Sequence, residues 1–394
     1  MKLSSRLDRI EPFYVMEFAK AAREVARSPA CDPAQGGRPM IYLNIGEPDF
    51  TAPPMVQAAA RTAVDAGLSQ YTDAVGLLPL RERISQWYGQ QHGLAIDPAR
   101  IIVTAGASAA LQLATLALFE TGDEVLMPDP CYPCNRHFVA ATGARAKLIA
   151  AGPQTRFQLS AEHVEGHWSE ATRGVLLASP SNPTGTSIAP TELARIVQAV
   201  RQRGGVSIVD EIYLGLSYDS AFSHSVLALG DDVISINSFS KYFSMTGWRL
   251  GWLVVPPQLV GPIEKLAQNL YICPSTIAQH AALACFEPES LAEYERRRES
   301  FRARRDFVVP ALNALGLTVP VLPDGAFYAW ADCSAHADSS WAFCEQLVQR
   351  AHVALTPGRD FGPAAAERYV RLSFATSLPL LQEAVKRIEQ ALIQ

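Results

Sequence analysis

Short runs of aliphatic and β-branched residues alternate with helical patterns through the middle of the chain. Strands that alternate with helices in this way are typical of βαβ units, which build a largely parallel sheet covered by helices. We therefore expect an α/β fold. The strands are predicted at residues 101–104, 124–127, 174–178, 206–209, 233–237 and 249–255, with helices at 108–119 and 191–201.

The C-terminal part of the chain follows a different pattern. A highly charged helix is predicted at 290–312, short strands at 326–330 and 369–374, and a last helix at 380–393. This mixture indicates a smaller α+β domain. We expect a large domain at residues 46–285 and a small domain at residues 286–394. Residues 1–45 are expected to form an N-terminal segment that packs on the small domain.

Composition excludes several classes of protein. The net charge of −5, from 34 basic and 39 acidic residues, argues against a nucleic-acid partner, which would need a basic surface. No run approaches the roughly 18 apolar residues of a membrane-spanning helix, so no membrane partner is expected. The seven cysteines are irregularly spaced, and residues 1–30 carry acids but no apolar signal region. These features favour a cytoplasmic protein with reduced thiols.

Several polar residues fall within a few positions after predicted strands. Because the carboxyl ends of the strands in an open α/β sheet line one crevice, we expect these side chains to lie close together. Any one of them alone is more often ordinary loop chemistry, and only their joint placement indicates a binding site. They are Ser108, Tyr132, Asn182, Asp210, Ser238 and Lys241.

The densest of these segments is Ser238-Phe239-Ser240-Lys241, with Arg249 eight residues further on. A lysine between small residues can approach a carbonyl group and form a Schiff base if burial keeps its amine partly neutral. The serines and Arg249 supply donors suited to a phosphate. A surface lysine and a solvated arginine are the alternative. The segment, up to Leu250-Gly251, resembles the lysine signature of the class I/II pyridoxal-phosphate-dependent aminotransferases.

This resemblance, to an aspartate-aminotransferase-like family, extends from about Asn44 to Arg371, which is most of the chain. It implies the fold-type I architecture, in which helices sandwich a mostly parallel sheet of the seven-stranded type and a smaller α+β domain follows. It also implies pyridoxal 5′-phosphate as the cofactor, with Lys241 as the Schiff-base lysine.

The resemblance assigns residues to the cofactor ring. Asp210 would pair with the pyridinium nitrogen, where a carboxylate keeps the ring protonated and able to accept electrons. Tyr213 and Asn182 would hydrogen-bond the phenolic oxygen. Tyr132 would stack on the ring, a role that suits a flat aromatic face. Taken singly, these residues could equally be a turn aspartate, a core tyrosine and an ordinary Asn-Pro turn.

The phosphate contacts come from the same resemblance. The turn before Ala107 and Ser108 opens a helix, and helix N-termini favour anions. Ser238, Ser240 and Arg249 would complete the phosphate site. Tyr71 is similar to a tyrosine that reaches the phosphate of the neighbouring subunit. The implied assembly is a homodimer with composite active sites.

Substrate recognition is predicted less fully. Arg371 lies in an alternating strand and resembles the arginine that clamps the α-carboxylate of the substrate. Asn182 belongs to the same subsite, and Gly46 looks like the glycine whose backbone approaches that carboxylate. Some aspartate-specific relatives carry a lysine where this chain has Ser108, which lowers the expectation of aspartate as donor. The aromatic segments at 13–18 and 327–330 hint at an apolar side chain.

The function that this pattern predicts is transamination. An L-amino acid would give its amino group to the cofactor, leaving pyridoxamine phosphate, and a 2-oxo acid would take it up in the second half of a ping-pong cycle. Lys241, Asp210 and Tyr213 are the expected catalytic residues, with Lys241 moving the proton from the substrate Cα.

Other readings of the sequence remain open. A carbon–sulfur β-lyase would share the same motifs, and a non-catalytic regulator that binds the cofactor is a more distant alternative. A nicotinamide dehydrogenase is disfavoured because no G-x-G-x-x-G follows a strand. Two sequence patterns are weak indications of a metal site. They are Cys131-x-x-Cys134, and His163 with His167 around Glu165. No metal is therefore expected.

Overall fold

A computed structural model describes residues 2–12 and 14–393. Its centre is a seven-stranded sheet in which β8 alone runs antiparallel to its neighbours, so the expected mostly parallel α/β architecture is confirmed. The strand order is β2-β8-β7-β6-β5-β3-β4. The strands are β2 (Ile101–Thr104), β3 (Glu124–Asp129), β4 (Arg145–Ala150), β5 (Thr172–Ala178), β6 (Val206–Asp210), β7 (Ile234–Ser238) and β8 (Gly251–Val254).

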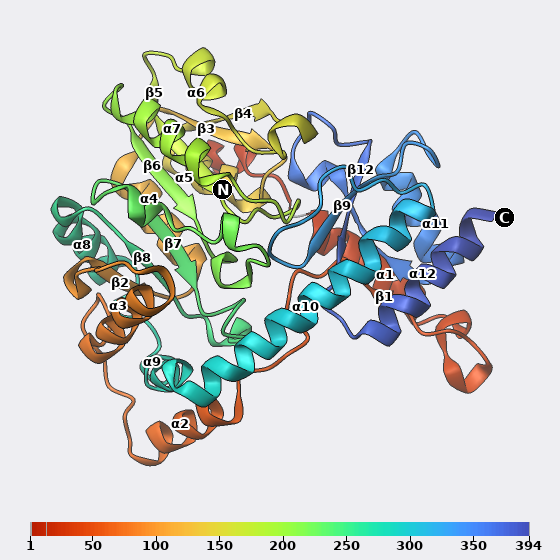
Figure 1. The fold of residues 1–394 in the computed structure, drawn as a ribbon, viewed down its shortest axis with the longest axis horizontal. Helices are drawn as coiled ribbons and strands as arrows, with labels where there is room; N and C mark the ends of the chain where they lie inside the picture. The colour runs from red at the N-terminus through yellow and green to blue at the C-terminus, as the bar shows by residue number, and fades with distance from the viewer. Residues whose placement is uncertain (1, 13, 394) are drawn as a thin grey trace.

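Helices cover both faces of this sheet (Figure 1). Successive strand residues point to opposite faces, so Ile208 joins one hydrophobic cluster and Val209 the other. One cluster includes residues of α3 (Leu78–His92), α6 (Ala161–His167) and α7 (Pro190–Arg201). The opposite cluster includes residues of α4 (Ala107–Leu118), α5 (Pro133–Thr142) and α8 (Val260–Leu270).

A second, smaller unit contains two short sheets. The 27-residue helix α10 (Pro288–Ala314), about 40 Å long, runs from the larger unit toward it (Figure 1). One sheet has the order β11-β12-β9 and the other pairs β1 with β10. The strands are β1 (Ile41–Tyr42), β9 (Tyr328–Asp332), β10 (Val353–Ala354), β11 (Thr356–Pro357) and β12 (Tyr369–Ser373). The remaining helices are α1 (Tyr14–Ala26), α2 (Pro54–Asp65), α9 (Thr276–Leu283), α11 (Ser340–Arg350) and α12 (Leu378–Ile393).

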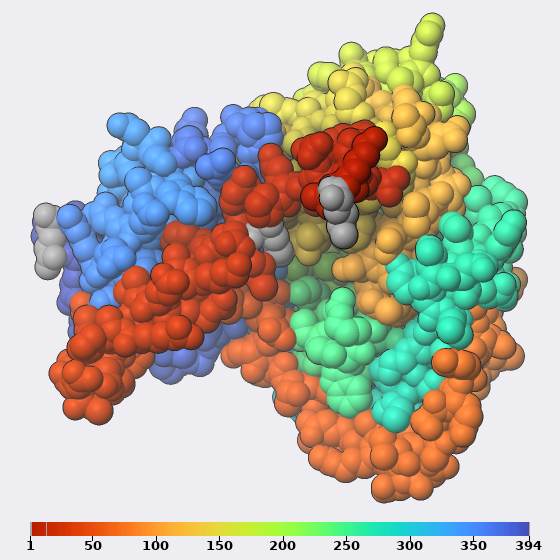
Figure 2. All heavy atoms as spheres, turned by 180° about the vertical axis from the view of Figure 1, so that it is seen from behind, coloured from red at the N-terminus to blue at the C-terminus, as the bar shows by residue number. Residues whose placement is uncertain are grey.

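The N-terminal segment contacts both units. In α1, Phe18 packs edge-on against Trp341 of α11, with ring centroids 5.6 Å apart. Before α1, Arg9 donates to the carbonyl of Gly143 beyond α5. Figure 2 shows this segment lying along the C-terminal unit and continuing onto the larger unit.

Most of the expected strands differ from the structure by one or two residues at an end, and one strand was not expected. β3 does not stop at Met127: it continues through Pro128, which is possible because parallel pairing with Ile149 persists there. The strand β4 is not among the expected strands, since it is a half-exposed edge strand of mixed composition. β8 begins at Gly251, because Arg249 has φ +55°, outside the extended region. Among the described residues, no helix is long and apolar enough to cross a lipid bilayer.

Candidate active site

A cavity of about 200 Å³ lies where β6 and β7 end, at the carboxyl edge of the sheet. The sequence-predicted site residues line it, with the exception of Tyr71. The structure thus brings together segments that are hundreds of residues apart in the chain. The lining includes Gly46, Ala107, Ser108, Tyr132, Asn182, Asp210, Tyr213, Ser238, Ser240, Lys241, Arg249 and Arg371.

Lys241 follows the end of β7 and reaches into this cavity. Its Nζ donates to the carbonyl oxygen of Gly46 at 2.6 Å and lies 5.9 Å from the ring centroid of Tyr213. Burial lowers the pKa of Lys241 to about 8, and the charges of Arg371 and Arg249 act in the same direction. A substantial part of this amine is therefore neutral, and nucleophilic, near neutral pH.

Asp210 is the last residue of β6 and is buried at the cavity wall. It accepts a hydrogen bond from the backbone N–H of Ile212 at 3.1 Å. Burial raises the pKa of Asp210 to about 7, and the neighbouring Glu211 raises it further. A buried carboxyl group of this kind becomes a stable anion when a cation, such as a protonated ring nitrogen, lies beside it.

An anion cradle forms where α4 begins. A Cβ on Gly106 would lie 2.7 Å from Nη2 of Arg249, and a Cβ on Gly251 would lie 2.8 Å from the backbone N of Ala107. The two glycines therefore let the guanidinium and the end of the helix come together. Arg249 Nη1 donates to the carbonyl of Thr246 at 3.0 Å, and Ser238 Oγ accepts from the N–H of Ser240 at 3.0 Å. The guanidinium charge of Arg249 and the dipole at the N-terminus of α4 favour a phosphate.

Arg371 is held rigidly in β12 at the other side of the cavity. It is buried and donates to Asn182 Oδ1 at 2.8 Å and to the carbonyl of Asn44 at 2.7 Å. Its guanidinium lies 4.5 Å from the ring centroid of Tyr328. Among the described residues, its buried Nε has no hydrogen-bond partner. The buried, fixed guanidinium at the cavity wall suits a carboxylate.

The residues fit pyridoxal 5′-phosphate. The neutral amine of Lys241 suits its aldehyde, the buried Asp210 suits its ring nitrogen, and the cradle at Arg249 suits its phosphate. Tyr132 stands at the start of α5 and adds an aromatic wall to the cavity.

The cavity also contains residues that the sequence did not single out. Tyr328 is fully buried, and its hydroxyl lies 2.7 Å from that of Tyr213. The signal that could have found Tyr328 is the aromatic segment at 327–330. The other additional lining residues are Leu111, Ala178, Pro180, Ile212 and Thr246.

One predicted residue, Tyr71, lies elsewhere. Tyr71 is 78% exposed on the surface and does not line the cavity of its own chain. In the aromatic segment at 13–18, Phe13 lies outside the described residues.

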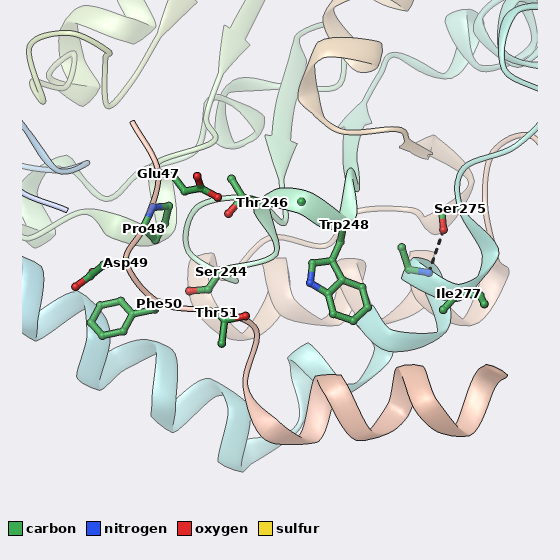
Figure 3. A pocket seen from close by; sticks show the side chains of 12 residues that line it. Glu47, Pro48, Asp49, Phe50, Thr51, Ser244, Thr246, Trp248, Ser275 and Ile277 are labelled. Atoms are coloured by element: carbon green, nitrogen blue, oxygen red, sulfur yellow. Dashed lines mark hydrogen bonds between the residues drawn. The ribbon is translucent and has the colours of Figure 1, made fainter. Parts of the chain in front are cut away.

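A second hollow, of about 660 Å³, adjoins the cavity and shares Thr246 with it. Figure 3 shows that it is bounded by the segment before α2, the loop that carries Trp248, and the start of α9. Two acidic residues line it. Asp49 is paired with Arg304 at 2.8 and 3.0 Å, whereas Glu47 is exposed.

The weak metal patterns have structural roles. His163 accepts from the N–H of Ser160 at 3.1 Å and so caps α6, and His167 Nδ1 lies 2.9 Å from the carbonyl of His163. Cys131 is buried, and burial raises the pKa of its thiol to about 12.

Comparison with known proteins gives concordant matches. The family described as "Aminotransferase class I and II" matches residues 38–388. The valine–pyruvate aminotransferase of Mycobacterium tuberculosis is 39% identical over 380 residues, which cover 96% of each chain. A crystal structure of an aminotransferase from the same organism has a TM-score of 0.94 at 38% identity, covering 100% of this chain and 99% of the other. The aspartate aminotransferase of Thermus thermophilus with maleate has a TM-score of 0.91 at 31% identity, covering 99% and 100%.

Proposed function

The chain belongs to the class I and II aminotransferases, and we propose that it prefers monocarboxylic amino acids with apolar side chains as donors. It has the fold-type I architecture and is a pyridoxal-phosphate-dependent enzyme that moves an amino group from an L-amino acid to a 2-oxo acid. The preference for apolar donors and the roles of individual residues are our proposal, as is the division into domains near residues 45 and 285.

The observation that carries the preference is the distribution of charge. The cationic side chains that line the cavity are Lys241, Arg249 and Arg371, and each has a proposed role at the cofactor or at the α-carboxylate. The adjoining hollow is lined by the carboxylates of Glu47 and Asp49; Asp49 is paired with Arg304, whereas Glu47 has no ion-pair partner among the described residues. A second carboxylate on the substrate would therefore meet the negative charge of Glu47, and no described residue that lines this hollow is a cation. A relative named for valine and pyruvate is consistent with this proposal.

Each proposed role follows from the geometry of a side chain. When bound, pyridoxal phosphate supplies an electron sink for the carbanion at the substrate Cα. Arg371 binds the substrate α-carboxylate and fixes the orientation of Cα. The neutral Nζ of Lys241 would remove the proton from Cα and deliver it to the cofactor carbon that carries the aldehyde. Asp210 holds a proton on the ring nitrogen, and the cradle at Arg249 binds the phosphate.

We include a homodimer with composite sites in this proposal. Tyr71 is exposed, and Leu270 and Ile272 are also half-exposed apolar residues, a pattern that suits contact with a second copy. Neither residues 66–77 nor residues 269–276 contain Lys or Arg, so a partner that contributes these segments would add no cation. All seven cysteines are free, which supports a reducing, cytoplasmic location.

A donor panel tests the proposal. Purified holoenzyme is assayed with valine, alanine, leucine, aspartate and glutamate against pyruvate and 2-oxoglutarate. We expect kcat/KM for an apolar donor to exceed that for aspartate by at least about 10-fold, since like charges that face each other cost more than about 1.4 kcal/mol, which equals one factor of ten. Equal or better use of aspartate would refute the preference. Release of pyruvate and ammonia from cysteine conjugates without an acceptor would instead identify a β-lyase. Analytical ultracentrifugation of the same preparation tests the dimer, and a monomer would refute it.

A further inference from the structure

Tyr328 contacts three separate parts of the active site. Its hydroxyl lies 2.7 Å from the hydroxyl of Tyr213, and its ring lies 4.5 Å from the guanidinium carbon of Arg371. Gly46 leaves space for it, because a Cβ at that position would lie 2.3 Å from the Tyr328 hydroxyl oxygen. The carbonyl of the same glycine accepts from Lys241. Tyr328 therefore lies where the proposed cofactor and substrate contacts meet.

Only one of the two tyrosine hydroxyls can be the donor in the hydrogen bond between Tyr213 and Tyr328. Burial raises the pKa of both Tyr213 and Tyr328, so each hydroxyl keeps its proton at neutral pH. A hydroxyl has one hydrogen to donate and can accept through its lone pairs. If Tyr213 donates toward the cofactor, its oxygen is left as the acceptor, and Tyr328 must donate to it.

We propose that Tyr328 is a positioning residue that donates to the hydroxyl of Tyr213 and so strengthens the hydrogen bond from Tyr213 to the phenolic oxygen of the cofactor. This inference rests on the proposed role of Tyr213. Successive hydrogen bonds polarise one another in a buried site, which makes Tyr213 a stronger donor. Packing of the Tyr328 ring against Arg371 keeps the donor in place.

The test replaces the hydroxyl and leaves the ring. In Tyr328→Phe holoenzyme, a weaker bond from Tyr213 stabilises the negatively charged oxygen less, so the pH midpoint of the absorbance change of the yellow enzyme should rise. We expect an upward shift of about half a pH unit, the size of an indirect hydrogen bond. Tyr213→Phe should shift it further. Because Tyr328 acts through Tyr213, adding Tyr328→Phe to Tyr213→Phe should produce no additional shift.

Tyr218→Phe is the matched control. Tyr218 is also a partly buried tyrosine close to the start of β9, but its hydroxyl donates to the carbonyl of Ala326 and it does not line the cavity. The pH midpoint of the absorbance change in Tyr218→Phe should equal that of the wild type. Thermal unfolding of each variant shows whether that variant is folded.

The outcomes separate the two proposals. A shift in Tyr213→Phe without one in Tyr328→Phe overturns the role of Tyr328. An equal shift from Tyr328→Phe in both backgrounds also overturns it, since Tyr328 would then act independently of Tyr213. If Tyr213→Phe itself causes no shift, the proposed role of Tyr213 is wrong, and the role of Tyr328 falls with it.

Discussion

The pKa of Lys241 makes the reactivity of the cofactor-free enzyme depend on pH in a way that an ordinary lysine does not. Burial lowers this pKa to about 8, against about 10.4 for an exposed lysine. At pH 7.5, about one quarter of the Lys241 amine is then neutral, compared with about 0.1% of an ordinary lysine amine. We therefore expect Lys241 to react about two orders of magnitude faster than a surface lysine of equal access.

Reductive methylation with formaldehyde measures this reactivity. Formaldehyde carries no phosphate, so the anion cradle does not enrich it at the site. Cofactor-free enzyme is pulsed between pH 6 and pH 10, and peptide mass mapping gives the rate at each lysine. The exposed Lys20 provides the comparison within the same digest. The rate at Lys241 should rise with a midpoint near pH 8 and then level off.

A charge variant tests the electrostatic part of the reasoning. The carboxylate of Glu47 raises the pKa of Lys241, so Glu47→Gln should move the midpoint to lower pH. A wild-type midpoint near 10 would refute the claim that burial activates Lys241. If the methylation midpoint of the wild type is near pH 8 but the midpoint of Glu47→Gln is higher, the assigned sign of the Glu47 effect is wrong.

Two further predictions follow from the cavity. Asp210→Asn should raise the unfolding temperature of the cofactor-free protein at pH 8. The reason is that the pKa of Asp210 is about 7 in the folded protein, so at pH 8 the folded protein must hold a buried charge that the asparagine lacks. The gain in unfolding temperature should fade as the pH falls from 7 to 4, because the folded wild type is then protonated at Asp210. Transamination should be lost in this variant at every pH, and a lower unfolding temperature at pH 8 would contradict the prediction. Gly106→Ala should weaken cofactor binding by at least about 10-fold in fluorescence titration, since its Cβ displaces Arg249. Gly122→Ala, also at positive φ but with open space around it, should leave cofactor affinity unchanged; equal losses in both variants would assign the effect to backbone strain.

Much of the sheet and of the site was predictable because both depend on local patterns. The buried strands β5 and β6 contain aliphatic runs, β7 alternates isoleucine with polar residues, and the polar residues Asp210 and Ser238 end β6 and β7 at the carboxyl edge of the sheet. The edge strand β4 was not predictable in this way, because only one of its six residues is buried and its hydrophobic pattern is weak. The start of β8 also depends on one left-handed residue, Arg249.

The order of residue types along the chain already specifies an α/β fold, a lysine shortly after a strand, and the polar residues that follow the neighbouring strands. Spacing in sequence does not specify which distant groups touch or how much water they lose. The hydroxyls of Tyr213 and Tyr328 are 115 positions apart, and Arg371 and Asn182 are 189 apart, yet each pair forms a hydrogen bond. The lowered pKa of Lys241 and the raised pKa of Asp210 likewise arise from burial, which exists only after the large and small units pack around the cavity.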